Sequence, residues 1–380
     1  MTIMRRLSRR RVSRSSRADR GTVRAVLKWV GTALLFALVG LCFAPTLVPP
    51  FLDRIYYRGP VSDHFDGERF FNPGAAPSTR VRRSPNFIGR MMGSDERAQW
   101  PSHVPVRQTV PPRQVAPGAM MVTWIGHATV LIQIDGLNIL TDPIWSEAAS
   151  PLPPFGPTRV RAPGVRFEDL PKIDLVLISH NHYDHMDLPT LRRLWARDRP
   201  TIVSSLGNDT ILRNAGVEAR AFDWGAGVRL GEAEVIVERN HHWGSRWFID
   251  RNRALWSAFT VRTPAGNIFF AGDTGWGDGS WAREAARHGP FRLAIIPIGA
   301  YEPRDVMQGS HVNPEEALRI FAALDPTVAL GMHWGTFQLT FEAIDGPPRT
   351  LAQLSRRSGL APGRFRATEV GHTFSVPAAR

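Results

Sequence analysis

The stretch LISHNHYDHMDL, from Leu177 to Leu188, holds three histidines and two aspartates within eight residues. Within it, His180, His182, Asp184 and His185 form the pattern H-x-H-x-D-H. Imidazole and carboxylate groups are ligands that suit zinc, manganese and iron(II). Because alternate residues of an extended turn point the same way, His180 and His182 can bind one ion together. Asp184 and His185 then face a second position, and two ions need more ligands than these four.

Three more ligand-type residues follow expected strands further along the chain. They are His242 in NHHW, Asp273 in AGDTG and His333 in GMHWG. Taken singly, each is ordinarily a hydrogen-bonded polar residue in a turn, but together with the four-residue cluster they predict a metal site. The only cysteine, Cys42, lies in an apolar segment near the N-terminus, so cysteine cannot supply the ligands. Any metal must be bound by His, Asp or Glu.

Strands and helices alternate around these motifs, and the polar motifs come where strands end. Strands are expected at 174–179, 234–239, 255–273 with a turn at 264–266, 292–299 and 328–330. Helices are expected at 188–198, at 280–289 with Ser280 as N-cap, and at 313–325 with Asn313 as N-cap and Pro314 at the first position. Folds of the α/β type place their chemistry at strand ends of this kind.

The net charge of +13 lies mostly in one tail. Residues 1–28 hold ten Arg or Lys against one acid, Asp19, and no charged residue follows from Trp29 to Leu52. A 20-residue apolar helix is about 30 Å long, which matches a bilayer core. We therefore predict a basic cytoplasmic tail at 1–28, a transmembrane anchor or signal segment at 29–48, a Pro/Arg-rich arm packing on the main domain at 49–118, and the main domain at 119–380.

The positive-inside rule keeps the basic tail in the cytoplasm and sends the body across the membrane. An uncleaved anchor predicts a single-pass protein of a bacterial inner membrane with a periplasmic domain. A cleaved signal predicts secretion to the periplasm, although no clear cleavage site follows the apolar run. The remainder of the chain is only weakly basic, so we expect no nucleic-acid partner.

An ordered set of motifs gives a family resemblance over about residues 60–375. TWIGHATVLIQIDGLNILTDPIWS, ISHNHYDHMD, HHWGSR, FFAGDTGW, PIGAYEPR, HVNPEEA and HWGTF resemble the metallo-β-lactamase superfamily, and more narrowly its N-acylphosphatidylethanolamine-hydrolysing phospholipase D branch. The resemblance implies a four-layer αββα sandwich with a dinuclear metal site at one edge of the two sheets. It implies two divalent ions, most simply zinc.

By motif, the resemblance implies seven metal ligands in two groups that share one carboxylate. His180, His182 and His242 bind the first ion, Asp184, His185 and His333 bind the second, and Asp273 bridges them. Asp184, Asp273 and His311 are the residues to which it gives catalytic roles. His311, Tyr301 and Tyr183 are the candidates for substrate contact, although His311 is equally explained as a histidine at a helix entry, and Tyr183 as a ring packed beside the metals.

The other histidines and one aspartate have structural interpretations. The resemblance implies that Asp142 braces the site, and we expect His127 to be a buried residue behind the ligands rather than a ligand itself. His241 is a neighbour of the ligand that follows it. His64, His103, His288 and His372 are surface or structural residues.

The expected reaction is hydrolysis by a hydroxide bridging two metal ions, because the chain contains neither G-x-S-x-G nor S-x-x-K. The resemblance implies a phospholipase D type phosphodiesterase acting on N-acylphosphatidylethanolamine-like lipids, with the membrane lipid as partner and a homodimer allowed. Two alternatives stay open: a lactonase or other soluble ester or phosphodiester hydrolase on the same fold, and a non-catalytic membrane-anchored scaffold. The loop at 149–168 either rests on a membrane interface or is a stiff surface loop.

Overall fold

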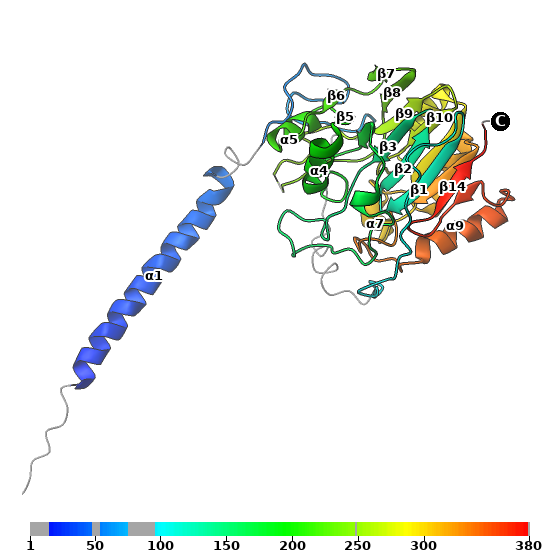
Figure 1. The fold of residues 1–380 in the computed structure, drawn as a ribbon. Coiled ribbons are helices and arrows are strands. Elements are labelled where there is room, and N and C mark those ends of the chain that lie inside the picture. Colours follow the sequence, from blue (N-terminus) through cyan, green and yellow to red (C-terminus); the bar gives the residue numbers. More distant parts are fainter. Residues whose placement is uncertain (1–14, 48–53, 75–95, 248, 379–380) are drawn as a thin grey trace, which may run out of the picture. The chain divides into compact units, whose positions relative to one another are not determined.

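A computed structural model describes residues 15–47, 54–74, 96–247 and 249–378 of the chain. The chain divides into two compact units, Met1–Arg54 and Ile55–Arg380. The first unit contains the long helix α1, Ser15–Leu47, and the second contains both β-sheets and the remaining helices (Figure 1). The apolar motif NFIGRMM of the predicted arm lies outside the described residues.

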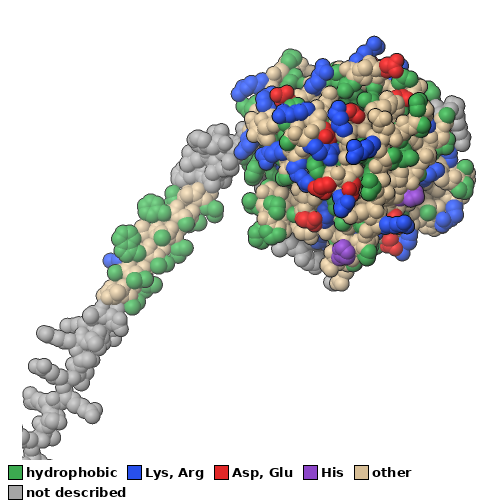
Figure 2. Space-filling model, viewed as in Figure 1, with side chains coloured by type: hydrophobic (Ala, Val, Ile, Leu, Met, Phe, Trp, Pro, Cys, Tyr) green, Lys and Arg blue, Asp and Glu red, His purple; other side chains and the backbone are tan. Residues whose placement is uncertain are grey.

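Helix α1 holds a segment, Gly21–Leu41, that is long and apolar enough to cross a membrane by length and composition. This apolar segment begins before the predicted segment 29–48. Helix α1 already includes Arg24 and Lys28 and continues past them without a break. Figure 2 shows mainly apolar side chains along the described part of α1, whereas Lys/Arg and Asp/Glu side chains are interspersed on the visible face of the second unit. A membrane anchor and a signal sequence both fit this helix.

The first sheet has seven strands in the order β14-β1-β2-β3-β4-β5-β6. Its strands are β1 Met120–Gly126, β2 Thr129–Ile134, β3 Leu137–Thr141, β4 Leu175–Ile178, β5 Thr201–Ser205, β6 Arg220–Phe222 and β14 Thr373–Val376. The β4 residues Leu175 and Leu177 belong to one apolar core, and Val176 and Ile178 belong to another. Because successive side chains of a strand point to opposite faces, this sheet is buried on both sides.

The second sheet also has seven strands, in the order β13-β12-β11-β10-β9-β8-β7. Its strands are β7 Gly227–Leu230, β8 Ala233–Glu238, β9 Ala258–Arg262, β10 Asn267–Phe270, β11 Phe291–Pro297, β12 Val328–Met332 and β13 Phe365–Arg366. Residues from the inner faces of both sheets share one large apolar core, which places the sheets face to face (Figure 1). The fold is therefore the predicted αββα sandwich.

Helices cover the outer faces of the sandwich. Helices α4, Leu188–Asp198, and α5, Asn208–Asn214, pack with the first sheet (Figure 1). Helices α6, Ser280–Ala285, and α8, Pro314–Leu324, pack with the second sheet, and α9, Gly346–Arg357, packs on α8. In the part of the chain that the structure describes, the remaining short helices are η1 Phe167–Asp169, η2 Ala286–His288 and α7 Arg304–Met307.

Two predicted helix starts have different outcomes. Asn313 is the N-cap of α8: its side chain accepts from the Glu316 backbone N–H, and the Glu316 carboxylate accepts from the Asn313 N–H. The Ser280 N-cap is wrong by one residue, because Gly279 occupies that position and Ser280 is the first helical residue. Asp278 causes the difference, since its Oδ1 accepts from the backbone N–H and the hydroxyl of Ser280.

The described parts of the arm belong to the same compact unit as the sheets. Phe65 and Phe70 are buried with Leu255 and Trp256. Asn72 reaches further, because its Nδ2 donates to the backbone carbonyl of His242 at 2.9 Å. The arm therefore touches the backbone of a residue that the sequence identifies as a metal ligand.

Candidate active site

One edge of the sandwich collects the ends of six strands. In the first sheet, β1, β3 and β4 run in one direction, as the antiparallel pairing of β2 with β1 and β3 and the parallel pairing of β3 with β4 require. In the second sheet the same argument aligns β8, β10 and β12. The residues just beyond these six ends are His127, Asp142 and His180 from the first sheet and His242, Asp273 and His333 from the second.

Three imidazole rings form the first group at this edge. His180 Nε2 lies 2.7 Å from His182 Nδ1, and His242 Nε2 lies 3.5 Å from the same nitrogen. The ligand-type atoms of these three residues all lie within 4.8 Å of one another, close enough to hold one ion. His180 and His182 follow β4 and His242 follows β8, so the fold brings together two strand ends although His182 and His242 are 60 residues apart in sequence.

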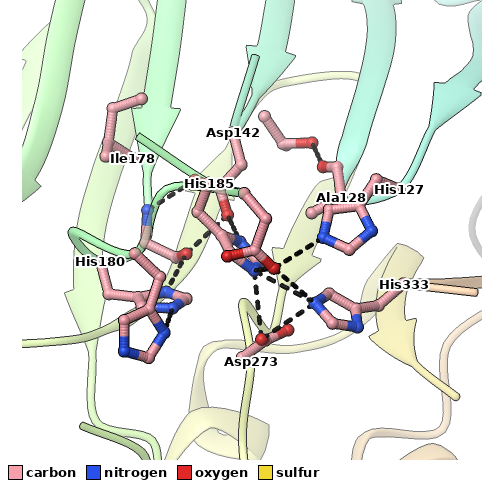
Figure 3. Close-up of polar contacts among 12 residues, drawn as sticks. His127, Ala128, Asp142, Ile178, His180, His185, Asp273 and His333 are labelled. Carbon is pink, nitrogen blue, oxygen red and sulfur yellow. Dashed lines mark hydrogen bonds and ion pairs between the residues drawn. The ribbon is translucent and has the colours of Figure 1, made fainter. Parts of the chain in front are cut away.

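Two carboxylates and two imidazoles form the second group (Figure 3). Asp184 Oδ2 lies 3.4 Å from His185 Nε2 and 3.5 Å from His333 Nε2. Asp273 Oδ2 lies 3.1 Å and 3.0 Å from the same two nitrogens, which are 3.2 Å apart. Asp273 also forms a group with His242 and His311 whose ligand-type atoms lie within 4.8 Å of one another. It therefore lies between the first and second groups.

Hydrogen bonds fix the orientation of three of the rings from behind. His185 Nδ1 lies 2.7 Å from Asp142 Oδ2, and His180 Nδ1 lies 2.9 Å from Ser179 Oγ. His242 Nδ1 lies 2.9 Å from the carbonyl oxygen of Ser310. An imidazole that donates from Nδ1 presents the lone pair of Nε2 to the site, which is how histidines are held for metal binding.

The buried carboxylates and imidazoles of the second group shift each other's pKa. Burial by itself raises the pKa of Asp184 and Asp273, but the nearby histidines outweigh burial and hold the pKa of both carboxyl groups well below the usual value. Burial lowers the pKa of His333, but Asp273 and Asp184 outweigh it and raise that pKa to about 9. Two ionised carboxylates thus require positive charge at the centre of the site. A divalent ion would supply that charge when the His185 and His333 rings are neutral.

The first group is uncharged at neutral pH. Burial lowers the pKa of His182 to about 3 and that of His180 and His242 well below the usual value. Three neutral imidazoles in contact present lone pairs toward a shared centre, and the buried Asp273 Oδ1 has no hydrogen-bond partner among the described residues. This set of nitrogen and oxygen donors fits divalent metal ions.

The predicted substrate residues lie in different surroundings. His311 is buried at the site, with Nδ1 3.7 Å from Asp273 Oδ2. The ring of Tyr183 lies under the guanidinium of Arg246, 4.0 Å from ring centroid to Cζ. Burial raises the pKa of Tyr301 to about 12, and its side chain is hydrogen-bonded to Thr350 in α9.

Sequence reasoning missed several residues that hold the site in place. Ser179 and Ser310 orient ligand rings, as described above, and Asn240 Nδ2 donates to the carbonyls of Ala271 and Asp273 at 2.9 Å. Ser179 adjoins the H-x-H-x-D-H pattern, so its place in the sequence could have indicated a role in holding the ligands. The contact of Ser310 joins segments 68 residues apart in sequence, and that of Asn240 joins segments 33 residues apart.

The remaining histidines outside the two groups make structural contacts. His64 Nε2 lies 2.8 Å from Asp223 Oδ1, and His288 Nδ1 lies 2.5 Å from the buried Glu238 Oε1. His241 Nδ1 lies 3.0 Å from the carbonyl of Gly309. His103 and His372 are exposed.

Known proteins share this fold and much of the sequence. A family model described as a beta-lactamase superfamily domain matches residues 137–334. N-acyl-phosphatidylethanolamine-hydrolyzing phospholipase D 1 of Caenorhabditis elegans is 34% identical over 271 residues, which cover 68% of this chain and 76% of that protein. The mitochondrial N-acyl-phosphatidylethanolamine-hydrolyzing phospholipase D of Saccharomyces cerevisiae is 32% identical over 259 residues, covering 66% of this chain and 55% of that protein.

A solved structure shows the same fold. Igni18, a metallo hydrolase from the archaeon Ignicoccus hospitalis, superposes with a TM-score of 0.52 at 22% identity and covers 68% of this chain and 99% of that one. The fold of this structure agrees with the two sheets described above. The chain belongs to the metallo-β-lactamase superfamily of metal-dependent hydrolases and resembles its N-acylphosphatidylethanolamine-hydrolysing phospholipases D.

Proposed function

We propose that this chain is a phosphodiesterase of phospholipase D type that hydrolyses N-acylphosphatidylethanolamine-like membrane lipids with two divalent metal ions, most simply zinc. The observation that carries the proposal is the convergence of seven ligand-type side chains in two adjoining groups at one edge of the sandwich. Its substrate class rests on the 34% identity to a phospholipase D of that specificity over 76% of the relative's length.

In this proposal each group of side chains holds one ion. His180, His182 and His242 hold the first, Asp184, His185 and His333 hold the second, and Asp273 contributes to both. When bound, two neighbouring ions lower the pKa of a water molecule and stabilise the negative charge that develops on a phosphate oxygen. The chain's own residues set the geometry in which this chemistry takes place.

The catalytic roles of Asp184 and Asp273 follow from the contacts of their carboxylates. Asp273 Oδ2 is within 3.1 Å of two ring nitrogens of the second group, and its other oxygen, Oδ1, has no partner among the described residues. One carboxylate can therefore face both groups and keep them at a short separation. Asp184 Oδ2 also accepts from His127 Nε2 at 2.9 Å, and this hydrogen bond helps to orient the carboxylate.

In this proposal His311 contacts the substrate. Its backbone is held by α7, because its N–H donates to Met307 O at 2.8 Å and its carbonyl accepts from Arg304. Burial lowers the pKa of its ring to about 4, so the ring is neutral at pH 7. A neutral imidazole donates one hydrogen bond, which suits a phosphate oxygen or the leaving oxygen. Tyr301 and Tyr183 are assigned weaker, lining roles beside the same site.

The proposed reaction breaks the bond between phosphorus and the headgroup oxygen. The water oxygen is transferred to phosphorus, giving phosphatidic acid, and the leaving oxygen takes a proton and departs as an N-acylethanolamine. Helix α1 supports a lipid substrate, because an uncleaved anchor confines the enzyme to the surface where that lipid lies. We propose a single-pass inner-membrane protein with the basic N-terminus in the cytoplasm and the catalytic domain in the periplasm.

A substrate panel tests this proposal. The full chain, purified in detergent and returned to vesicles, is assayed on N-acylphosphatidylethanolamine, on unmodified phosphatidylethanolamine, on a simple lactone and on a water-soluble phosphodiester. In water enriched in ¹⁸O, we expect phosphatidic acid that carries the label, with turnover highest on the N-acylated lipid. Turnover confined to the lactone or to the soluble ester would replace the phospholipase assignment with another hydrolase, and no turnover by a metal-loaded chain would favour a scaffold.

A further inference from the structure

His127 lies in the turn between β1 and β2, at the same edge as the proposed ligands. It is buried, and its backbone takes a left-handed conformation with φ of 54°. A residue other than glycine rarely adopts this conformation unless its surroundings hold it there. The contacts of its ring and of its backbone both lead to the second group of proposed metal ligands.

The ring of His127 contacts the carboxylate of Asp184, which is 57 residues away in sequence. His127 Nε2 lies 2.9 Å from Asp184 Oδ2. Figure 3 shows the His127 ring next to His333. An ionised carboxylate can only accept hydrogen bonds, so Nε2 carries the proton and donates it. The same oxygen lies 3.4 Å from His185 Nε2 and 3.5 Å from His333 Nε2, so the contact from His127 is the shortest of the three and the one that holds this carboxylate in place.

The backbone of His127 contacts the segment that carries His333. The His127 carbonyl accepts from the His333 N–H at 3.0 Å and from the Trp124 indole N–H at 3.0 Å. The His127 N–H donates to Thr336 Oγ1 at 3.0 Å. His333 itself has φ of 66°, so the backbone of this proposed ligand is held in a conformation that needs such support.

We propose that His127 is the positioning residue of the second metal position, holding the Asp184 carboxylate through its ring and the His333 segment through its backbone. The inference rests on the proposed function, because it assigns a role at the same site. A ring nitrogen of His127 lies within 4.8 Å of the ligand-type atoms of Asp184, His185 and His333. The inference nevertheless gives His127 no place among the ligands, because its Nε2 donates its proton to Asp184. Its other nitrogen, Nδ1, is buried without a hydrogen-bond partner among the described residues.

Two substitutions separate the ring from the backbone. His127→Phe removes the N–H donor and keeps a planar ring, whereas His127→Gln places an amide N–H close to the position of Nε2. Both keep the backbone bonds to His333 and Thr336, and both impose the same left-handed backbone on a residue with a Cβ. The two variants therefore carry the same backbone strain and differ only in the hydrogen bond to Asp184.

The measurement is the affinity of each ion for the full chain in detergent, by titration with Zn²⁺ against a chromophoric chelator after metal removal. We expect His127→Phe to weaken the second ion by about 10–100-fold, the usual effect of losing a partner behind a metal ligand. His127→Gln should recover most of that affinity, and the first ion should bind equally in all three chains. Thermal unfolding of the metal-free chains is recorded in parallel.

Three outcomes would overturn the inference. Wild-type affinity in His127→Phe would show that the ring does not position Asp184. Equal loss of an ion in both variants would make His127 a ligand, because an amide is a poor substitute for imidazole. Lower thermal stability with unchanged metal affinity would show that His127 stabilises the fold and does not position a metal ligand.

The wild-type chain separates this inference from the proposed function. Two bound ions with no lipid turnover would contradict the proposed function and leave the His127 comparison intact. A wild-type chain that binds no second ion would contradict both.

Discussion

Replacing Asp142 by asparagine should weaken metal binding without removing any ligand. Asp142 is fully buried and accepts three hydrogen bonds: from the Ser179 N–H at 2.7 Å, from the Ser179 hydroxyl at 2.5 Å and from His185 Nδ1 at 2.7 Å. The amide of Asp142→Asn offers one acceptor oxygen and one NH₂ group in place of two oxygens. If the NH₂ takes the place of Oδ2, it faces the Nδ1–H of His185. If it takes the place of Oδ1, it faces the backbone N–H of Ser179.

The His185 ring can avoid the clash by moving its proton from Nδ1 to Nε2. Nε2 is the atom that faces His333 and Asp273, so this tautomer cannot bind the ion there. The cost is about that of one hydrogen bond to a charged group, about 1.5–3 kcal/mol. At about 1.4 kcal/mol per factor of ten, the second ion should bind about 10–150-fold more weakly.

Stability should change less than metal affinity in the same variant. Burial raises the pKa of Asp142, which means that its charge is costly to keep inside the protein. Asparagine removes that cost, and this offsets part of the lost hydrogen bonding when the metal-free chain unfolds. A larger effect on metal affinity than on the free energy of unfolding is therefore the result expected of a residue that orients a ligand.

Chelator competition on the full chain at pH 7.5, with urea unfolding of the metal-free protein beside it, measures both quantities. Asp174→Asn is the matched control, because Asp174 Oδ2 accepts from the Asn138 N–H at 3.0 Å and an amide oxygen can replace it. The control should bind both ions as the wild type does. If Asp142→Asn also binds both ions with wild-type affinity, the reasoning about the His185 tautomer is refuted.

Three further predictions concern single side chains. His182→Ala should lose most bound metal and nearly all activity while its circular dichroism stays that of the wild type, and two ions per chain in this variant would remove His182 from the ligands. His311→Ala should keep both ions and lose turnover by about 10²–10⁴-fold, whereas unchanged turnover would take it away from the substrate. Asp223→Asn should destabilise the chain more at pH 6 than at pH 8.5 in thermal unfolding, and equal effects would contradict the ion pair.

The sign of that pH effect follows from His64. Burial lowers the pKa of His64, but hydrogen bonds to Asp223 and Asp63 outweigh it, and the net pKa lies above 6.5. A raised pKa in the folded state contributes stability that is fully present below pH 6.5 and is lost as the pH rises through the folded value. The contribution of Asp223 should accordingly be larger at pH 6 than at pH 8.5.

Local patterns predicted the elements that position the site. The apolar run Leu175–Ile178 formed a strand buried on both faces, and Asn313 began α8 with both capping hydrogen bonds. Leucines at helical spacing placed α4 at Leu188–Asp198. Each of these features depends on residues within a few positions of one another, so a single sequence displays them.

Contacts between distant segments were not predictable in the same way. The sequence indicated that His127 is buried but not that its ring meets Asp184, because that contact requires the ends of β1 and β4 to lie at one edge. The Ser310 carbonyl behind His242 and the Arg246 guanidinium over Tyr183 depend equally on how the loops beyond the strands fold back. Sheet register sets these contacts, and one sequence without the fold does not reveal it.

The number of metal ions bound to each chain tests the central claim most directly. The full chain is purified in detergent without added metal, and its metal content is measured by elemental analysis in wild type and in His182→Ala. The account predicts close to two divalent ions per wild-type chain and a clear loss in the variant. A correctly folded wild-type chain that holds no metal and takes up none from Zn²⁺ would contradict it.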